Sequence, residues 1–251
     1  QTGGDLGLAM LPDPFLTPAV KNPRALPMAA PLYPLFLKLD DQRCLVVGGG
    51  VIGAGKAEEL LRCGARVVAV SPAFAPPWDR LPAERLQRVV RRFASGDEAG
   101  SRLVFSATGD TDVDATVVGS CRQAGILVNV VDVPDRCDFY AGSQVRRGDL
   151  CVAVSTAGAS PSLAILLRRR IEAVVPAASA ALVEHLARIR PALLHALPGY
   201  GDRARCMEAV LGRVLERLDA DDRAGIVDLV DQELAREGIC LPLSPPAQEA
   251  A

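Results

Sequence analysis

Residues Arg43 to Lys56 read Arg-Cys-Leu-Val-Val-Gly-Gly-Gly-Val-Ile-Gly-Ala-Gly-Lys, and this stretch decides the fold. The apolar run at 44–47 predicts a buried strand, which leads through a triple glycine into a helical pattern that ends at Gly64. A second apolar run, Arg66–Val70, follows at once. Within this strand–turn–helix–strand unit the glycines have the spacing G-x-G-x-x-G, which predicts a site for a dinucleotide.

Each glycine of the motif has a separate physical purpose. Gly48 permits the tight turn, Gly50 lets a pyrophosphate approach the backbone, and Gly53 lets the helix pack closely on the strand. The free N–H groups at the start of the helix then face the phosphates. A glycine-rich turn without a ligand is the alternative, and the complete unit around the motif favours the dinucleotide. The predicted cofactor-binding residues are Gly48, Gly49, Gly50, Val51, Ile52, Gly53, Ser71, Pro72, Thr108 and Asn129.

The composition is that of a globular protein with one large or two modest domains. The chain has 251 residues, of which 49% are hydrophobic and 23% charged. Its net charge of −2 excludes the basic field that nucleic acid requires, and no apolar stretch is long enough for a membrane span. The seven cysteines form no C-x-x-C pair, which favours reduced thiols in the cytoplasm. His185 and His195 lie far from any cysteine pair, so we expect surface histidines and no metal site.

Strand and helix patterns alternate from Tyr33 to about Ser155, which is typical of an α/β fold with a doubly wound parallel (Rossmann) sheet. Gly64 and Gly125 stand where helices should end. We expect six strands, at Cys44–Val47, Arg66–Val70, Leu86–Arg91, Leu103–Ala107, Leu127–Val131 and Leu150–Ser155.

The pattern becomes helical after Ser155. Ser160-Pro161 predicts a helix start, and the leucines, isoleucine and valines at 163–175 form one apolar face that ends at Pro176. Further helices follow to Gly238, with breaks near Pro191 and at 198–201. We therefore divide the chain into a poorly ordered leader (1–31), a Rossmann domain (32–157), a dimerisation and substrate-pocket region (158–190), a small helical domain (191–240) and a tail (241–251).

Few residues near the predicted crevice can carry chemistry. Asp132 directly follows the strand at 127–131, where a carboxylate can accept a proton beside hydride transfer, although a turn aspartate before Pro134 is the alternative. The second strand ends in Val70-Ser71-Pro72, with neither an acid for a ribose hydroxyl nor an adjacent arginine for a 2′-phosphate, so NAD and NADP both stay open. Cys137 has no evident base nearby, and we interpret it as an ordinary thiol.

Several separated stretches resemble one family, the precorrin-2 dehydrogenases, which form the N-terminal half of multifunctional siroheme synthase. The similarity covers residues 32–176 and is weaker beyond. The stretches that carry it are Tyr33–Leu37, Val46–Gly50 with Lys56, Leu61–Ala65, Val128–Asp132, Cys137–Phe139, Ser155-Thr156 with Ser160-Pro161, Leu166–Arg168, Ile171-Glu172 and Pro176.

The resemblance implies NAD-dependent oxidation of the tetrapyrrole precorrin-2 to sirohydrochlorin by a cytoplasmic homodimer. It implies a catalytic role for Asp132 and places Ser160 beside the tetrapyrrole pocket. Arg146, Arg147 and Arg168 then suit the carboxylates of the substrate, whereas a solvated basic face is the alternative for the 168–170 run. Some members also insert Fe²⁺. Departures at Gly55 and at 140–146 flank the tetrapyrrole side, so iron insertion is less well supported than the oxidation.

A non-catalytic, dinucleotide-sensing module with a partner-binding helical tail is the alternative from another class. Such a sensor needs neither Asp132 nor the nearby arginines. Incubation of the protein with precorrin-2 and NAD⁺ separates the two hypotheses, because a sensor forms no NADH.

Overall fold

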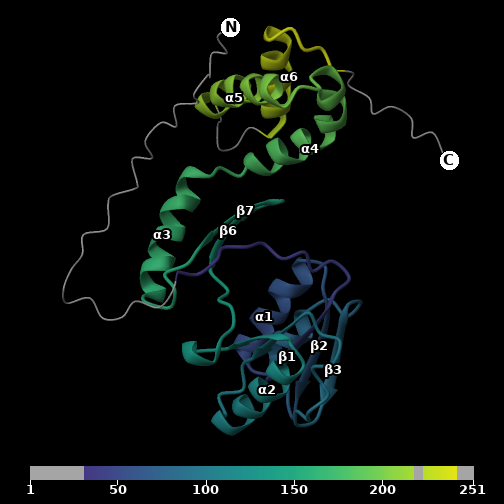
Figure 1. The fold of residues 1–251 in the computed structure, drawn as a ribbon, viewed down its shortest axis with the longest axis vertical. Coiled ribbons are helices and arrows are strands. Elements are labelled where there is room, and N and C mark those ends of the chain that lie inside the picture. Colours follow the sequence, from purple (N-terminus) through teal and green to yellow (C-terminus); the bar gives the residue numbers. More distant parts are fainter. Residues whose placement is uncertain (1–30, 218–222, 242–251) are drawn as a thin grey trace, which may run out of the picture. The chain divides into compact units, whose positions relative to one another are not determined.

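The computed structural model describes residues 31–217 and 223–241, shown as coloured ribbon in Figure 1. The predicted leader and tail therefore lie almost entirely outside the described residues. In chain order the elements are β1 (Arg43–Val47), α1 (Val51–Arg62), β2 (Arg66–Ser71), β3 (Leu86–Val90), β4 (Leu103–Ser106), α2 (Thr111–Gln123), β5 (Leu127–Val130), β6 (Ser143–Arg147), β7 (Leu150–Val154), α3 (Pro161–Val174), α4 (Ser179–Ala196), α5 (Tyr200–Arg217) and α6 (Arg223–Arg236).

The first part is a parallel sheet with the strand order β3-β2-β1-β4-β5. The chain begins in the middle of the sheet at β1, extends to one edge through β2 and β3, and crosses back to β4 and β5 on the other side. The order therefore reverses next to β1, and the glycine turn after β1 lies at that switch point, where sheets of this kind bind ligands. The predicted Rossmann architecture is confirmed for this part of the chain.

Alternate residues of each strand build two separate cores, one on each face of the sheet. Cys44 and Val46 of β1 pack with Ala54 and Ala57 of α1 and with Trp78, which lies in a 3₁₀ turn at Pro76–Arg80. The intervening residues of β1 pack with α2 on the opposite face, in a core with Val117, Val118 and Cys121. Because both faces are covered, the central strands β1 and β4 are near-continuous apolar runs, as the sequence indicated for several strands.

The expectation of a sixth strand in this sheet is wrong. The segment at 150–154 is β7, and it pairs in antiparallel orientation with β6 in a separate two-stranded sheet. The turn between them has two residues, Gly148 and Asp149, with Gly148 at φ 57°. A two-residue loop joins antiparallel strands, whereas a parallel neighbour requires a crossover of a dozen residues or more. The turn sequence Arg-Gly-Asp carried this signal, and β6 itself was not predicted.

Helix α3 begins as expected, with the Ser160 hydroxyl accepting a hydrogen bond from the Leu163 N–H at 3.2 Å and Pro161 in the first helical position. Its predicted apolar face, however, is largely uncovered. Leu166 is 56% exposed and Val174 77% exposed, and Ala164 is the buried residue of the helix.

The helices α4, α5 and α6 share a third core. It includes Leu182 and Leu193 of α4, Val210 of α5, and Val230 and Leu234 of α6. The expected break near Pro191 is wrong, because Pro191 lies inside α4. Burial of the flanking Ile189 and Leu193 in this core offsets the hydrogen bond that the proline cannot donate.

The expectation that both histidines lie on the surface is also wrong for His185, whose exposure is 3%. Its Nε2 lies 2.8 Å from Asp231 Oδ1, and Arg188 donates to its Nδ1 at 2.7 Å. Because a guanidinium can only donate, Nδ1 of His185 accepts the hydrogen bond from Arg188. The ring hydrogen is therefore on Nε2, which donates a hydrogen bond to the Asp231 carboxylate. The histidine thus joins α4 to α6 as a structural residue.

Candidate functional site

A cleft of about 590 Å³ opens at the carboxyl ends of the central strands. Six of the predicted cofactor-binding residues line it: Gly48, Gly49, Gly50, Ser71, Pro72 and Thr108. Val51, Ile52, Gly53 and Asn129 are outside its lining, as is Asp132. The structure adds residues that the sequence did not indicate, among them Phe74, Arg92, Phe93 and Val113.

Two glycines of the motif are required by backbone packing. Gly48 has φ 114°, and a Cβ atom there would lie 2.3 Å from the carbonyl oxygen of Ala107. A Cβ atom on Gly53 would lie 2.2 Å from the carbonyl oxygen of Gly48. The turn after β1 is therefore wedged between α1 and the end of β4, as the motif predicted.

Gly50 differs from the other two, because a Cβ atom there would meet nothing within 4 Å. Gly50 is the N-cap of α1 with no side-chain cap, and the first N–H donated within the helix is that of Ala54. Within the described residues, the N–H groups of Val51, Ile52 and Gly53 have no acceptor. Free N–H groups at a helix start beside a backbone without a Cβ atom form a cradle for phosphate.

Hydrogen bonds hold the glycine turn in place from the β2 side. The N–H of Ala75 donates to the carbonyl oxygen of Gly49 at 2.8 Å, and the indole N–H of Trp78 donates to that of Gly50 at 3.1 Å. A Cβ atom on Gly49 would lie 1.9 Å from the carbonyl oxygen of Ala73. The loop after β2 therefore packs directly on the turn and makes one wall of the cleft.

On the opposite wall of the cleft, a buried carboxylate orients two hydroxyl side chains. Oδ1 of Asp114 in α2 accepts hydrogen bonds from the hydroxyl groups of Ser106, at 2.7 Å, and Thr108, at 2.6 Å. Asp110 caps α2 by accepting from the N–H groups of Asp112 and Val113. The rotamer of Thr108 is thereby fixed where it faces the cleft. The sequence singled out Thr108 and missed Asp114, whose role depends on the contact between α2 and β4.

Asp132 follows the carboxyl end of β5 at the same edge of the sheet. It is exposed and has φ 61°, a left-handed conformation that aspartate tolerates better than most residues. Asn129 does not point toward the cleft. Its side-chain amide is buried and donates to the carbonyl oxygen of Phe139 at 2.8 Å and to Cys137 Sγ at 3.4 Å.

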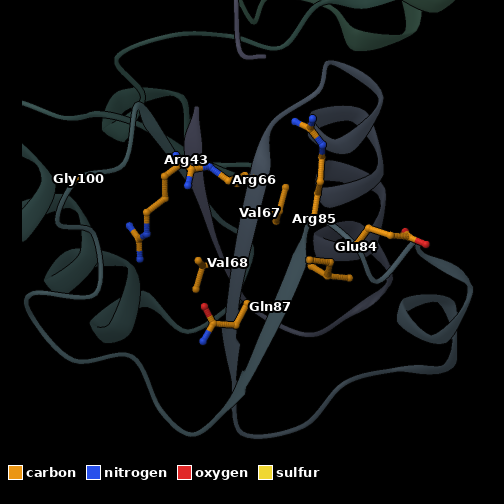
Figure 2. A pocket seen from close by; sticks show the side chains of 9 residues that line it. Arg43, Arg66, Val67, Val68, Glu84, Arg85, Gln87 and Gly100 are labelled. Carbon is orange, nitrogen blue, oxygen red and sulfur yellow. The ribbon is translucent and has the colours of Figure 1, made fainter. Parts of the chain in front are cut away.

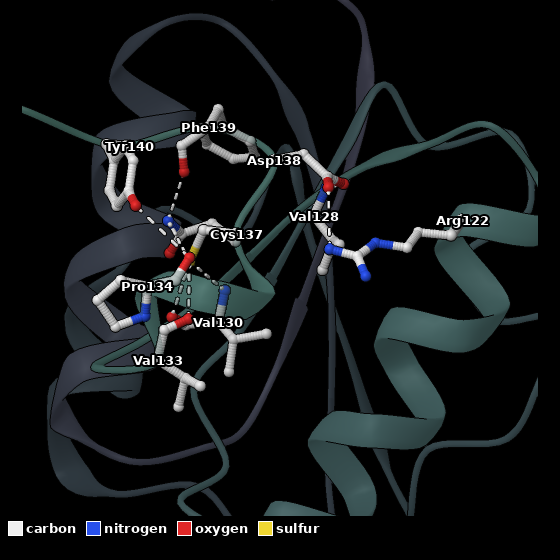
Figure 3. Close-up of polar contacts among 10 residues, drawn as sticks. Arg122, Val128, Val130, Val133, Pro134, Cys137, Asp138, Phe139 and Tyr140 are labelled. Carbon is white, nitrogen blue, oxygen red and sulfur yellow. Dashed lines mark hydrogen bonds and ion pairs between the residues drawn. The ribbon is translucent and has the colours of Figure 1, made fainter. Parts of the chain in front are cut away.

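The segment after the Asp132 turn returns along β5 and closes its edge. The Asp138 N–H donates to the Val128 carbonyl oxygen at 2.8 Å, and the Asp138 carboxylate accepts from the Val128 N–H at 3.1 Å and from Arg122 at 3.3 Å (Figure 3). The Cys137 thiol contacts the Val130 N–H and carbonyl oxygen. Burial raises the pKa of this thiol, which fits an unreactive structural cysteine. The turn that carries Asp132 is thus held at both ends.

The predicted substrate-binding arginines have mixed surroundings. Arg147 donates to the carbonyl oxygens of Val175, at 3.1 Å, and Glu172, at 3.4 Å, which ties β6 to the end of α3. Arg168 pairs with Glu172 one helical turn away. Arg146 contacts Gln144 on its own strand at 3.2 Å. Arg147 and Arg168 therefore have partners within the hairpin and α3. Arg146 has the fewest contacts of the three arginines, so its guanidinium is the most available for a ligand.

A second hollow, of about 450 Å³, lies at the amino ends of β1, β2 and β3 (Figure 2). Arg43, Arg66 and Arg85 line it, and each has partners. Arg43 donates to the carbonyl oxygens of Asp97 and Ala99, Arg66 pairs with Asp41, and Arg85 donates to the carbonyl oxygen of Gly64. These contacts brace the sheet, and no helix N-terminus of the glycine motif faces this edge.

In the described ranges, 31–217 and 223–241, no group of three or more His, Cys, Asp and Glu side chains is placed to hold a metal ion. Over the same residues, no helix is both long and apolar enough to cross a membrane.

The fold and the cleft together define a dinucleotide-binding protein of the Rossmann class. Residues 35–143 match the putative NAD(P)-binding family, and residues 147–173 match the family described as sirohaem biosynthesis protein, central. Over these two ranges the chain is similar to proteins of siroheme biosynthesis.

Known relatives agree with this assignment. Siroheme synthase 1 of Halorhodospira halophila is 40% identical over 213 residues, which are 81% of this chain and 44% of the relative. Siroheme synthase of Thioalkalivibrio sulfidiphilus is 44% identical over 156 residues, which are 61% and 32% of the two chains. The chain thus spans less than half the length of these relatives.

The fold has a solved counterpart. The structure of SirC, precorrin-2 dehydrogenase, covers 83% of this chain and all of its own, with a TM-score of 0.59 and 22% sequence identity. At this identity the match supports the arrangement of elements.

Proposed function

We propose that this chain catalyses the NAD-dependent oxidation of precorrin-2 to sirohydrochlorin. The observation that carries the proposal is the combination of the phosphate cradle at Gly49–Gly53 with a following segment, 147–173, of the sirohaem biosynthesis family. The cradle fits a dinucleotide because a Cβ atom on Gly50 would project into open space beside free N–H groups.

The residues of the chain have distinct parts in this proposal. The start of α1 binds the pyrophosphate, and Ser71 lies at the carboxyl end of β2, where the adenosine ribose is expected. Bound NAD supplies the hydride acceptor. Asp132, exposed on a held turn, takes the proton that leaves the macrocycle, either directly or through a water that it orients. Ser160 and Arg146 contribute polar groups to the tetrapyrrole side.

The test is to mix the purified chain with precorrin-2 and NAD⁺ without oxygen and to follow NADH by absorbance. We expect NADH and sirohydrochlorin to form in equal amounts. Binding of NAD⁺ without turnover would favour the sensor instead. Absence of NAD⁺ binding would refute both hypotheses.

We also propose that the chain forms a homodimer through α3 and the β6–β7 hairpin. The support is the uncovered apolar face of α3, on which Leu163, Leu166 and Val174 are exposed. Light scattering after gel filtration should give twice the chain mass, and Leu166→Glu should give the monomer mass. A monomeric unmodified chain would contradict this proposal.

Iron insertion into sirohydrochlorin is a further activity that we propose for the same site, with Fe²⁺ as a substrate. Removal of pyrrole protons needs a base, and Asp132 is the exposed carboxylate at the end of β5. Anaerobic Fe²⁺ and sirohydrochlorin should give the siroheme absorbance with the chain present. A rate equal to that without protein would remove this part of the proposal.

A further inference from the structure

We propose that the cleft also accepts a dinucleotide with a 2′-phosphate on its adenosine ribose, and that Arg92 recognises this phosphate. The inference rests on the proposed function, because it concerns the coenzyme of the same site. It goes beyond that function in assigning a specificity residue and in extending the coenzyme range to NADP.

The strand pairing brings Arg92 to the end of β2. In the parallel pairing of β2 with β3, Ser71 lies opposite Val90, and the N–H of Arg91 donates to the carbonyl oxygen of Ser71 at 3.1 Å. The next residue, Arg92, lines the same cleft as Ser71 and Pro72. The adenosine ribose of a dinucleotide bound at the glycine turn is expected at this end of β2.

Arg92 is available, whereas its neighbour is not. Arg91 makes a two-pronged ion pair with Asp97, at 2.5 and 2.6 Å. Arg92 is exposed, and its guanidinium has no ion pair or hydrogen bond among the described residues. A free guanidinium on the wall of an anion-binding cleft suits a phosphate, because its fork of donors matches the phosphate oxygens.

The acid that would reject a 2′-phosphate is missing from the end of β2. A carboxylate there accepts hydrogen bonds from the ribose hydroxyls and repels a phosphate. In this chain the position holds Ser71, which is uncharged and buried. The carboxylate that does line the cleft belongs to Asp110, and it is engaged in capping α2. The local charge at the ribose end is therefore positive.

The experiment measures binding without turnover. Calorimetric titration of the full chain with 5′-ADP and with 2′,5′-ADP isolates the contribution of the phosphate, and NAD⁺ and NADP⁺ are titrated in parallel. The variants are Arg92→Ala and Arg102→Ala. Arg102 is also exposed, but it precedes β4 at the amino ends of the strands, away from the cleft. Its replacement therefore controls for the loss of one positive charge.

We expect 2′,5′-ADP to bind roughly ten- to a hundredfold more tightly than 5′-ADP, the range for a hydrogen bond to a charged group. Arg92→Ala should abolish this difference, while Arg102→Ala should preserve it. Equal affinities of the two ADP forms, or a difference that survives Arg92→Ala, would overturn the inference while the proposed function stands. Failure of all four ligands to bind would instead overturn the proposed function.

Discussion

The three glycines of α1 and its cap provide a matched test of the cofactor turn. Gly53→Ala places a Cβ atom 2.2 Å from the Gly48 carbonyl oxygen, against the 3.4 Å of ordinary contact. The turn and the helix must therefore separate, at a cost of about 1–3 kcal/mol for overpacking. Gly55 lies in the same helix, where an added Cβ atom meets nothing within 4 Å. Gly55→Ala should therefore stabilise the protein by up to about 1 kcal/mol through helix propensity.

Unfolding followed by fluorescence measures both effects, because Trp78 is the single tryptophan and is buried against the turn. At roughly 2–4 °C per kcal/mol for a chain of this size, Gly53→Ala should lower the Tm by about 2–12 °C, and Gly55→Ala should raise it by up to about 4 °C. A Gly53→Ala protein as stable as the unmodified chain would refute the argument that the turn is wedged. Equal losses in both variants would show that Cβ contact is not the cause.

Gly50→Ala separates folding from binding. Its Cβ atom meets no protein atom, and its backbone has φ −74°, which alanine adopts readily. We therefore expect an unchanged Tm and an affinity for NADH lowered by at least about tenfold, the equivalent of one hydrogen bond to a charged group. Unchanged NADH affinity would place the pyrophosphate away from the N-terminus of α1.

Three further predictions concern side chains around the sheet. Asp132→Asn should keep NAD⁺ affinity and lower turnover of precorrin-2 by roughly 10²–10⁴-fold, the usual contribution of a general base, and steady-state kinetics with full activity would refute the role. Asn129→Ala leaves the carbonyl oxygen of Phe139 without its donor, so urea unfolding should show a loss of about 1–3 kcal/mol, and no loss would show that the returning segment is held otherwise. The hydrogen bond from Arg91 holds the pKa of Asp97 below its usual value. The ionised Asp97 carboxylate should therefore stabilise the folded protein fully above about pH 4, the pKa of an unfolded aspartate, and this stabilisation should be lost as the pH falls through the lower pKa of the folded state. Comparison of the unmodified protein with Asp97→Asn by urea unfolding at pH 7 and pH 3 should therefore show a smaller difference at pH 3, and a constant difference would contradict this.

Much of the fold followed from local patterns. The strand of β1, the glycine turn, the start of α1 and the end of α1 at Gly64 are each specified within a few residues, since turn conformation and helix capping depend on near neighbours. The N-cap at Ser160 was found in the same way. The errors arose where one apolar segment suited several partners. The apolar run at 150–154 predicts a buried parallel strand by its composition alone. In the structure, however, the two-residue turn before it makes this run one strand of an antiparallel hairpin.

The site shows the same division. Local sequence is enough to specify the phosphate cradle, because its glycines and its helix start are contiguous, and it puts Asp132 at the end of a strand. Which distant segments pair, by contrast, emerges from the packing of the whole fold. Register between β2 and β3 brings Arg92 to the cleft, and packing of α2 on β4 places Asp114 beneath Thr108. Such contacts depend on which strands become neighbours, and strand order is a property of the whole packed sheet that no local stretch of sequence encodes.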